Sequence, residues 1–64
     1  MKNWIAIIAF PHPSGTIPYV LQDDEKVSTF ASTKEIERIA ERHLFRDGEW
    51  TAFNFKTGET EWLR

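Results

Sequence analysis

The stretch from Trp4 to Phe10, Trp-Ile-Ala-Ile-Ile-Ala-Phe, decides the fold that we expect for this chain. All of its residues are apolar, most are β-branched or aromatic, and Pro11 follows directly. A run of this kind is typical of a strand that is buried on both faces. A helix is disfavoured, because about ten residues are needed before a helix becomes the better interpretation and the proline would end it at once. We therefore expect a central strand, with a helix over one face and less regular structure or a partner over the other.

Two further strands are predicted between this run and the helix. Residues 11–16 form a cluster of breakers that indicates a loop, and residues 17–22 follow as a strand with Pro18 near its start. A loop of about six residues favours an antiparallel hairpin, because a crossover to a parallel strand needs about a dozen. The polar residues 23–26 then predict a turn, and residues 27–30 a short third strand.

One helix is predicted, from Thr33 to Leu44. Ser32 and Glu35 have the spacing of a capping box, in which the serine hydroxyl accepts a hydrogen bond from the Glu35 amide and the carboxylate reaches back to the Ser32 amide. His43 lies within the apolar stripe of this helix, and we expect its ring at the edge of the core with one nitrogen bonded to a carbonyl. The stripe has the i, i+3, i+4, i+8 spacing of a face that packs on a sheet, and it comprises Ile36, Ile39, Ala40 and Leu44.

A hairpin is predicted to close the sheet. Residues 49–55 alternate so that Trp50 lies on one face and Phe53 on the other. Residues 56–59 contain a glycine and form the turn, and residues 60–63 form the last strand.

These elements account for nearly all of the chain and leave no room for a second domain. We expect one α+β domain over residues 1–64, with an antiparallel meander of four to five strands in ββ(β)αββ order and one helix packed on one face. No cysteine is present, so neither a disulfide nor a thiolate metal site can support so small a core. Three Trp, five Phe and one Tyr supply buried area instead.

Charge and hydrophobicity exclude several function classes. Eight basic and ten acidic residues give a net charge of −2, so we expect no long-range attraction for nucleic acid or for an anionic membrane. A membrane span requires about 20 consecutive apolar residues, which the chain lacks. Lys2 and the apolar run resemble the start of a secretory signal, but the following prolines and the missing small-residue cleavage site disfavour that interpretation. We therefore expect a cytoplasmic protein.

Catalytic and metal chemistry are disfavoured as well. Ser14, Ser28 and Ser32 fit a loop, a strand and a helix cap, and none stands in a Gly-x-Ser-x-Gly sequence. His12 and His43 are far apart and lack the paired spacing of a zinc site. A domain of this size rarely encloses a substrate cleft. We expect no enzymatic activity, no cofactor and no metal site.

The aromatic side chains are the main candidates for a binding site. Both faces of the C-terminal hairpin carry large rings, and one short helix can cover only some of them. Either an aromatic patch stays exposed as an interaction surface, or a strongly twisted sheet buries its own rings, and the sequence leaves both possibilities open. The candidate contacts are four aromatic residues, namely Tyr19, Trp50, Phe55 and Trp62. The acidic turns at the ends of the strands are expected to form a negative rim around them, comprising Asp23, Asp24, Glu25, Asp47, Glu49, Glu59 and Glu61.

Two functions follow from such a surface. The first is that of a small soluble non-catalytic module, which binds or modulates a larger protein with a basic surface or self-associates as a homodimer. The alternative is single-stranded nucleic-acid binding by stacking of bases on the sheet aromatics, which the net charge disfavours. In size and architecture the chain is similar to many small α+β proteins, including phage and mobile-element proteins that act by binding a host protein.

Overall fold

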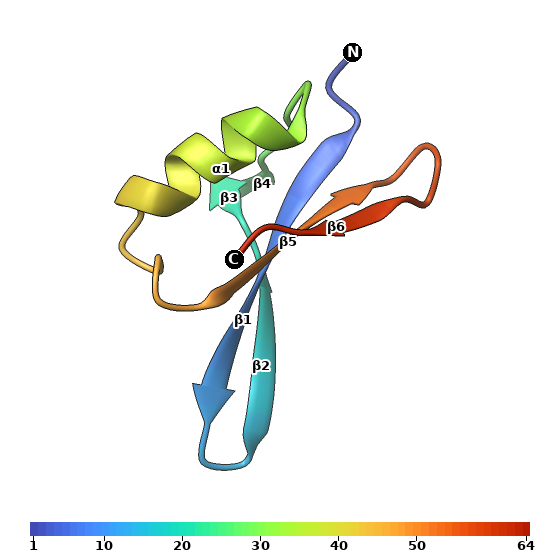
Figure 1. The fold of residues 1–64 in the computed structure, drawn as a ribbon. Coiled ribbons are helices and arrows are strands. Elements are labelled where there is room, and N and C mark those ends of the chain that lie inside the picture. Colours follow the sequence, from blue (N-terminus) through green and yellow to red (C-terminus); the bar gives the residue numbers. More distant parts are fainter.

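The computed structural model describes all residues from Met1 to Arg64 and has the predicted α+β architecture. Four strands form one sheet in the order β2-β1-β5-β6 with every neighbouring pair antiparallel, and β3 and β4 form a separate two-stranded hairpin. Helix α1 packs on one face of the larger sheet (Figure 1). The elements in chain order are β1 (Trp4–His12), β2 (Gly15–Val20), β3 (Gln22–Asp23), β4 (Lys26–Val27), α1 (Thr33–Arg42), β5 (Glu49–Asn54) and β6 (Thr60–Trp62).

The apolar run of β1 lies at the centre of the sheet, as its composition predicts. β1 pairs with β2 along one edge and with β5 along the other. Ala6 and Ile8 are fully buried on the side of α1, whereas Ile5 and Ile7 on the opposite face stay partly exposed. The two faces of the central strand are therefore unequally covered.

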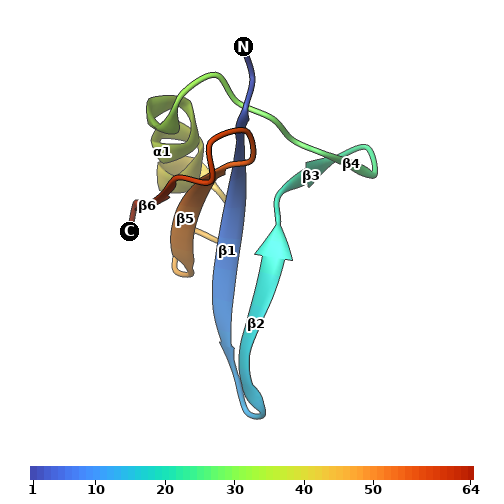
Figure 2. The same ribbon diagram turned by 90° about the vertical axis from the view of Figure 1, so that its right-hand side faces the viewer.

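The loop predicted over residues 11–16 is a two-residue turn. β1 and β2 continue to pair as far as His12 opposite Gly15, whereas β5 pairs with β1 only up to Ala9. The end of the β1–β2 hairpin therefore projects beyond the other elements (Figures 1 and 2). This projection contributes to the elongated shape of the molecule, whose principal extents are 37 × 24 × 24 Å.

The position of each proline within the ladder explains why the strands continue through them. The Leu21 amide donates to the Ala6 carbonyl at 2.9 Å, which places a hydrogen-bonded pair at that position of the β1–β2 ladder. Hydrogen-bonded and non-bonded pairs alternate in an antiparallel ladder, so Pro11 and Pro18 both fall at non-bonded pairs. Neither ring removes a donor that the β1–β2 ladder needs.

β3 and β4 form an excursion from the edge of the sheet. Before it, Leu21 is bonded to β1, and after it Phe30 exchanges two backbone hydrogen bonds of 3.0 and 2.8 Å with Trp4. The strand predicted over 27–30 is therefore reduced to Lys26–Val27 and an isolated bridge at Phe30.

The acidic turn predicted at residues 23–26 is present between β3 and β4. Asp24 and Glu25 have φ angles of 51° and 66° and connect the paired residues Asp23 and Lys26. Positive φ at both central residues is the conformation of a type I′ turn, the two-residue turn that matches the twist of a hairpin.

Helix α1 ends two residues earlier than its apolar stripe predicts. Ile36 and Ala40 are fully buried, but Ile39 is 37% exposed and Leu44, which lies beyond the helix, is 81% exposed. The helix stops because His43 takes an extended conformation, in which its Nδ1 accepts a hydrogen bond from the Phe45 amide at 3.0 Å. The prediction that Leu44 belongs to the packed stripe is therefore wrong.

His43 itself lies at the edge of the core, as predicted, with its ring centroid 5.3 Å from that of Phe45 and 5.2 Å from that of Trp50. Its Nδ1 is bonded to an amide, however, and not to a carbonyl.

Neither hydrogen bond of the predicted capping box is present at the start of the helix. The Ser32 side chain makes no capping hydrogen bond. Glu35 does reach back, but its Oε2 accepts from the Ala31 amide at 2.8 Å and not from the Ser32 amide. One free amide before the helix is satisfied in this way.

The core lies between α1 and the covered face of the sheet. Ala6 and Ala52 are directly opposite each other in the β1–β5 ladder, and Ala40 of the helix belongs to the same cluster. Small side chains at these positions let the helix approach the sheet closely. The buried cluster comprises Ala6, Ile8, Leu21, Phe30, Ile36, Ala40, Trp50 and Ala52.

Gly48 offers a direct test of how closely the segment after α1 packs against β1. A Cβ atom at this position would lie 2.9 Å from Ile8 Cγ2 and 3.1 Å from the Ala9 carbonyl oxygen. We expect Gly48→Ala to lower the free energy of unfolding by about 1–3 kcal/mol, because the backbone or Ile8 must move. Thermal denaturation followed by circular dichroism should show a fall in Tm of at least about 4 °C. An unchanged Tm would contradict the close approach of the 45–48 segment to β1.

Candidate functional site

The registers of the sheet place a continuous row of side chains on the face opposite α1. Val20 of β2 lies opposite Ile7 of β1, Ile7 lies opposite Thr51 of β5, and Thr51 lies opposite Trp62 of β6. Directly paired residues share a face, so this row crosses all four strands. We call this side of the sheet the open face, and its members are Ile5, Ile7, Ala9, Pro18, Val20, Glu49, Thr51, Phe53, Thr60 and Trp62.

Two shorter rows flank the first one. Ile5, Phe53 and Thr60 are paired across β1, β5 and β6 on one side of it. On the other side Ala9 pairs with both Pro18 and Glu49. The open face is therefore mainly aliphatic, with one phenyl ring and one indole.

The open face carries the most exposed indole of the protein at its edge. Trp62 is 67% exposed, whereas Ile5, Ile7, Val20 and Phe53 are partly shielded by their neighbours on the sheet. The only helix lies on the other face, and the β3–β4 hairpin shares a groove of about 570 Å³ with Ile39 and His43 on the helix side. Nothing in the chain covers the open face.

Carboxylates stand at one end of this surface. A shallow hollow of about 310 Å³ is lined by Ala9, Pro11, Thr16, Asp47 and Glu49. The hollow joins the apolar rows to two acidic side chains, so a partner with a basic side chain next to apolar ones would find complementary groups there.

Trp50 does not belong to this surface. Its side chain is fully buried on the side of α1, and its Nε1 donates a hydrogen bond to the Phe45 carbonyl at 3.0 Å. An indole without accessible surface cannot contact a partner, so Trp50 is not a contact residue in this fold. Alternation along β5 placed Trp50 and Phe53 on opposite faces correctly, but it does not say which face the helix covers.

The other predicted contacts are distributed over both faces. Tyr19 lies on the covered face, where its ring centroid is 5.8 Å from that of Phe45. Phe55 follows β5, is 51% exposed and continues the alternation of Phe53. Of the four predicted aromatic contacts, Phe55 and Trp62 therefore remain as candidates for the open face.

The predicted acidic rim is only partly beside the open face. Asp23, Asp24 and Glu25 form the end of the β3–β4 hairpin, and Asp23 lines the groove that this hairpin shares with α1. Asp47 and Glu49, two other residues of the predicted rim, line the hollow at one end of the open face.

Asn54 supports this surface, although no pattern in the sequence indicates that it does. It is buried, and its Oδ1 accepts hydrogen bonds from the amides of Lys56 at 2.9 Å and Thr57 at 3.0 Å. Its carbonyl also accepts from the Gly58 amide at 2.7 Å. Asn54 therefore fixes the turn that sets β6, and with it Trp62, against β5.

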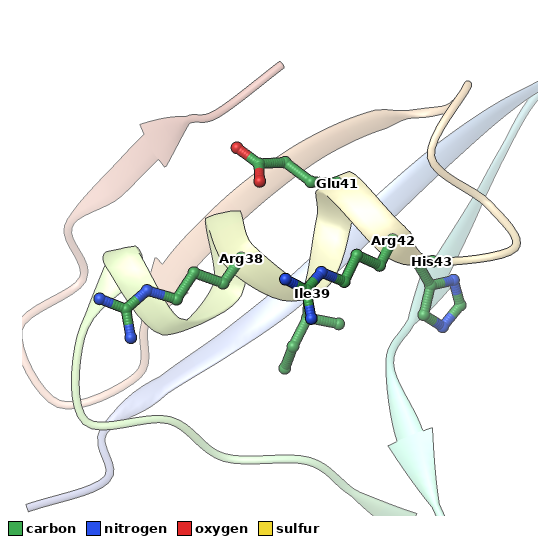
Figure 3. A pocket seen from close by; sticks show the side chains of 5 residues that line it. All are labelled: Arg38, Ile39, Glu41, Arg42 and His43. Carbon is green, nitrogen blue, oxygen red and sulfur yellow. The ribbon is translucent and has the colours of Figure 1, made fainter.

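A second hollow lies along α1 and is shown in Figure 3. Its volume is about 400 Å³, and it is lined by Arg38, Ile39, Glu41, Arg42 and His43. The side chains of Arg38, Glu41 and His43 spread in different directions and do not converge on one point (Figure 3). With one apolar residue and divergent charges, this hollow has no arrangement typical of a catalytic or ligand site.

His12 and Ser14 form the one contact between a histidine and a hydroxyl. His12 Nδ1 lies 2.8 Å from Ser14 Oγ and also accepts from the Ser14 amide at 3.2 Å. Both residues are exposed in the β1–β2 turn, and neither lines any of the hollows of the structure. The contact therefore stabilises the turn of this hairpin.

Three comparisons with known proteins found no match, whether with family profiles, with curated proteins or with solved structures. The structure contains no group of three or more His, Asp or Glu side chains placed to hold a metal ion. Its helix lacks the length and the apolar character that crossing a membrane would require. The open face is the surface whose chemistry points most directly to a function.

The two tryptophans of the C-terminal hairpin should respond oppositely to truncation. Trp50→Ala removes a fully buried side chain, and we expect a loss of about 3–5 kcal/mol, enough to unfold a domain of this size. Trp62→Ser removes an exposed one, and we expect a change in stability below about 1 kcal/mol. Circular dichroism and urea denaturation measure both, and equal losses would contradict the assignment of the two faces.

Proposed function

We propose that this protein is a non-catalytic interaction module that docks its open face on a larger protein. The observation that carries the proposal is the cross-strand row that ends in Trp62, an indole that is 67% exposed. Contiguous exposed apolar surface usually marks an interaction site, and Trp is enriched among the residues that dominate binding energy. The row supports this function more directly than any hollow on the helix side.

The size of the open face favours a larger protein over a second copy of the chain. Four strands about 4.8 Å apart and three rows about 7 Å apart give a surface of roughly 14 Å by 14 Å between the outermost Cα positions. A stable dimer buries about 800 Å² on each partner, which would be about a sixth of the total surface of 4789 Å². The open face alone is too small for that. A larger protein can reach past it to Phe55 and to the projecting β1–β2 hairpin.

The charges favour a basic region on the partner. Asp47 and Glu49 line the hollow at one end of the open face, and the chain has a net charge of −2. Complementary charge at the rim of an interface mainly raises the association rate and selects the partner. We also propose a cytoplasmic location, since a chain without cysteine gains nothing from an oxidising compartment.

Trp62→Ser and Leu44→Ser form a matched pair for testing the docking surface. Both remove a large exposed apolar side chain, but Leu44 lies beyond α1 and outside the open face. We expect Trp62→Ser to weaken binding to a partner purified by affinity to the wild-type protein by about 30-fold or more, as for loss of a side chain worth about 2 kcal/mol. Leu44→Ser should bind as the wild type does, in calorimetric titrations of both variants.

Equal affinities of the two variants would contradict the proposal. Sedimentation equilibrium of the protein alone should give a monomer. A dimer that Trp62→Ser dissociates would show that the open face is closed by self-association, and would replace the larger partner by a second copy.

Stacking of single-stranded nucleic acid on Trp62 is the competing function, because an exposed indole can accept a base on its face. The carboxylates of Asp47 and Glu49 line the hollow at one end of the open face, where they repel phosphates. We expect no change in the fluorescence anisotropy of labelled oligo(dT) at low salt. An anisotropy increase with the wild type that disappears in Trp62→Ser would favour nucleic-acid binding instead.

A further inference from the structure

The two edges of the four-stranded sheet differ in their capacity to accept another strand. β2 forms one edge, and the ladder position of Pro18 turns its nitrogen outward, where a paired strand would need an N–H donor. The β3–β4 excursion begins directly beyond this strand. The β2 edge is therefore poorly suited to pairing.

The outer edge of β6 has free backbone groups. The Leu63 amide donates to the Trp50 carbonyl and the Asn54 amide donates to the Glu59 carbonyl, each at 2.8 Å, which fixes the hydrogen-bonded positions of the β5–β6 ladder. By alternation the N–H and C=O groups of Thr60 and Trp62 point away from β5. All three residues of β6 are exposed, so two donors and two acceptors stand in solvent.

The side chains of β6 give this edge an apolar side and an acidic side. Thr60 and Trp62 lie on the open face, and Glu61 lies on the opposite face beside Ala52. On that second side a hollow of about 150 Å³ is lined by Glu37, Glu41, Leu63 and Arg64. An added strand would therefore meet an indole on one side and, on the other, three carboxylates with the single guanidinium of Arg64 among them.

We propose that the partner of this protein contributes an extended strand that adds antiparallel to β6, with apolar side chains beside Trp62 and basic side chains beside Glu61. The inference rests on the proposed function and specifies how the partner meets the same surface. Addition of a strand at a sheet edge supplies affinity through main-chain hydrogen bonds and specificity through alternate side chains. The alternation of one apolar side and one acidic side selects a strand of alternating apolar and basic residues.

A second copy of the chain does not fit this edge. In an antiparallel β6–β6 pair centred on Glu61, the two Glu61 carboxylates would face each other across the ladder, which is destabilising. A pair centred on Trp62 would need the backbone of Arg64, whose carbonyl already accepts from the Trp50 amide at 2.9 Å. The β2 strand of a second copy carries Pro18 on its outer edge.

The test uses a blocked peptide of sequence Lys-Ile-Lys-Val-Lys-Ile-Lys, which has the required alternation. In the proposed pairing its apolar residues donate backbone hydrogen bonds to β6, while its Lys amides point to solvent. We expect exchange of the Thr60 and Trp62 amide hydrogens, measured by NMR, to slow by at least about 10-fold at saturating peptide. N-methylation of the apolar residues should abolish this protection, and N-methylation of the Lys residues should leave it unchanged.

Four results would overturn the strand addition. Three of them are binding without slower exchange, equal binding of the two N-methylated peptides, and equal binding of a peptide with Glu in place of Lys. The fourth is the absence of binding by all peptides. In each case the comparison of Trp62→Ser with Leu44→Ser decides separately whether the proposed function stands, because that comparison does not depend on backbone pairing.

Discussion

The single helix can cover only one face of the sheet, and the rest of this structure depends on that constraint. Helix α1 has ten residues and is therefore about 15 Å long, enough to cover one face of a small sheet and no more. Ala6, Ala40 and Ala52 all belong to the buried cluster between helix and sheet, and their small side chains favour a close contact there. The apolar side chains divide accordingly between a closed core and an open face, and the central strand contributes to both.

Most of the aromatic rings of the chain pack on the covered face of the sheet. Six of the nine rings belong to the core or pack against it. The segment after α1 extends the cover, because the ring of Phe45 lies with its centroid 4.7 Å from that of Phe10 and 5.8 Å from that of Tyr19. This extension is also why Leu44 points to solvent: the chain turns at His43 to bring the next ring inward. What remains uncovered is mainly aliphatic surface with Trp62 at its edge.

The parts of the fold that depend on local pattern could be predicted from the sequence. The central position of the Trp4–Phe10 run, the start of the helix and the alternation along residues 49–55 all follow from composition and spacing. The end of the helix could not be predicted, because it depends on a hydrogen bond between the His43 ring and the Phe45 amide. The length of the β1–β2 turn depends on whether each proline meets a bonded or a non-bonded pair, which only the register decides.

The candidate site was predictable only in part, for the same reason. Alternation separates Trp50 from Phe53, but the identity of the covered face depends on where the helix packs. Tyr19 is a predicted contact because of its aromatic ring, but its pairing with Ile8 places it on the side of the core. The sequence alone does not identify the aliphatic residues of the open face as a site. An Ile in a strand is common, and only the register shows that it forms a row with others.

The register of a single hairpin separates the buried tryptophan from the exposed one in this protein. Trp50 lies in the core and Trp62 in solvent because Trp62 pairs with Thr51, the residue next to Trp50. A slip of one residue would exchange the faces of β6, so that Trp62 would turn toward α1 and Glu61 toward the open face. The hydrogen bonds from the amides of Lys56 and Thr57 to Asn54 hold the turn in which that register is set. The buried side-chain amide of Asn54 therefore helps to keep the Trp62 indole on the open face.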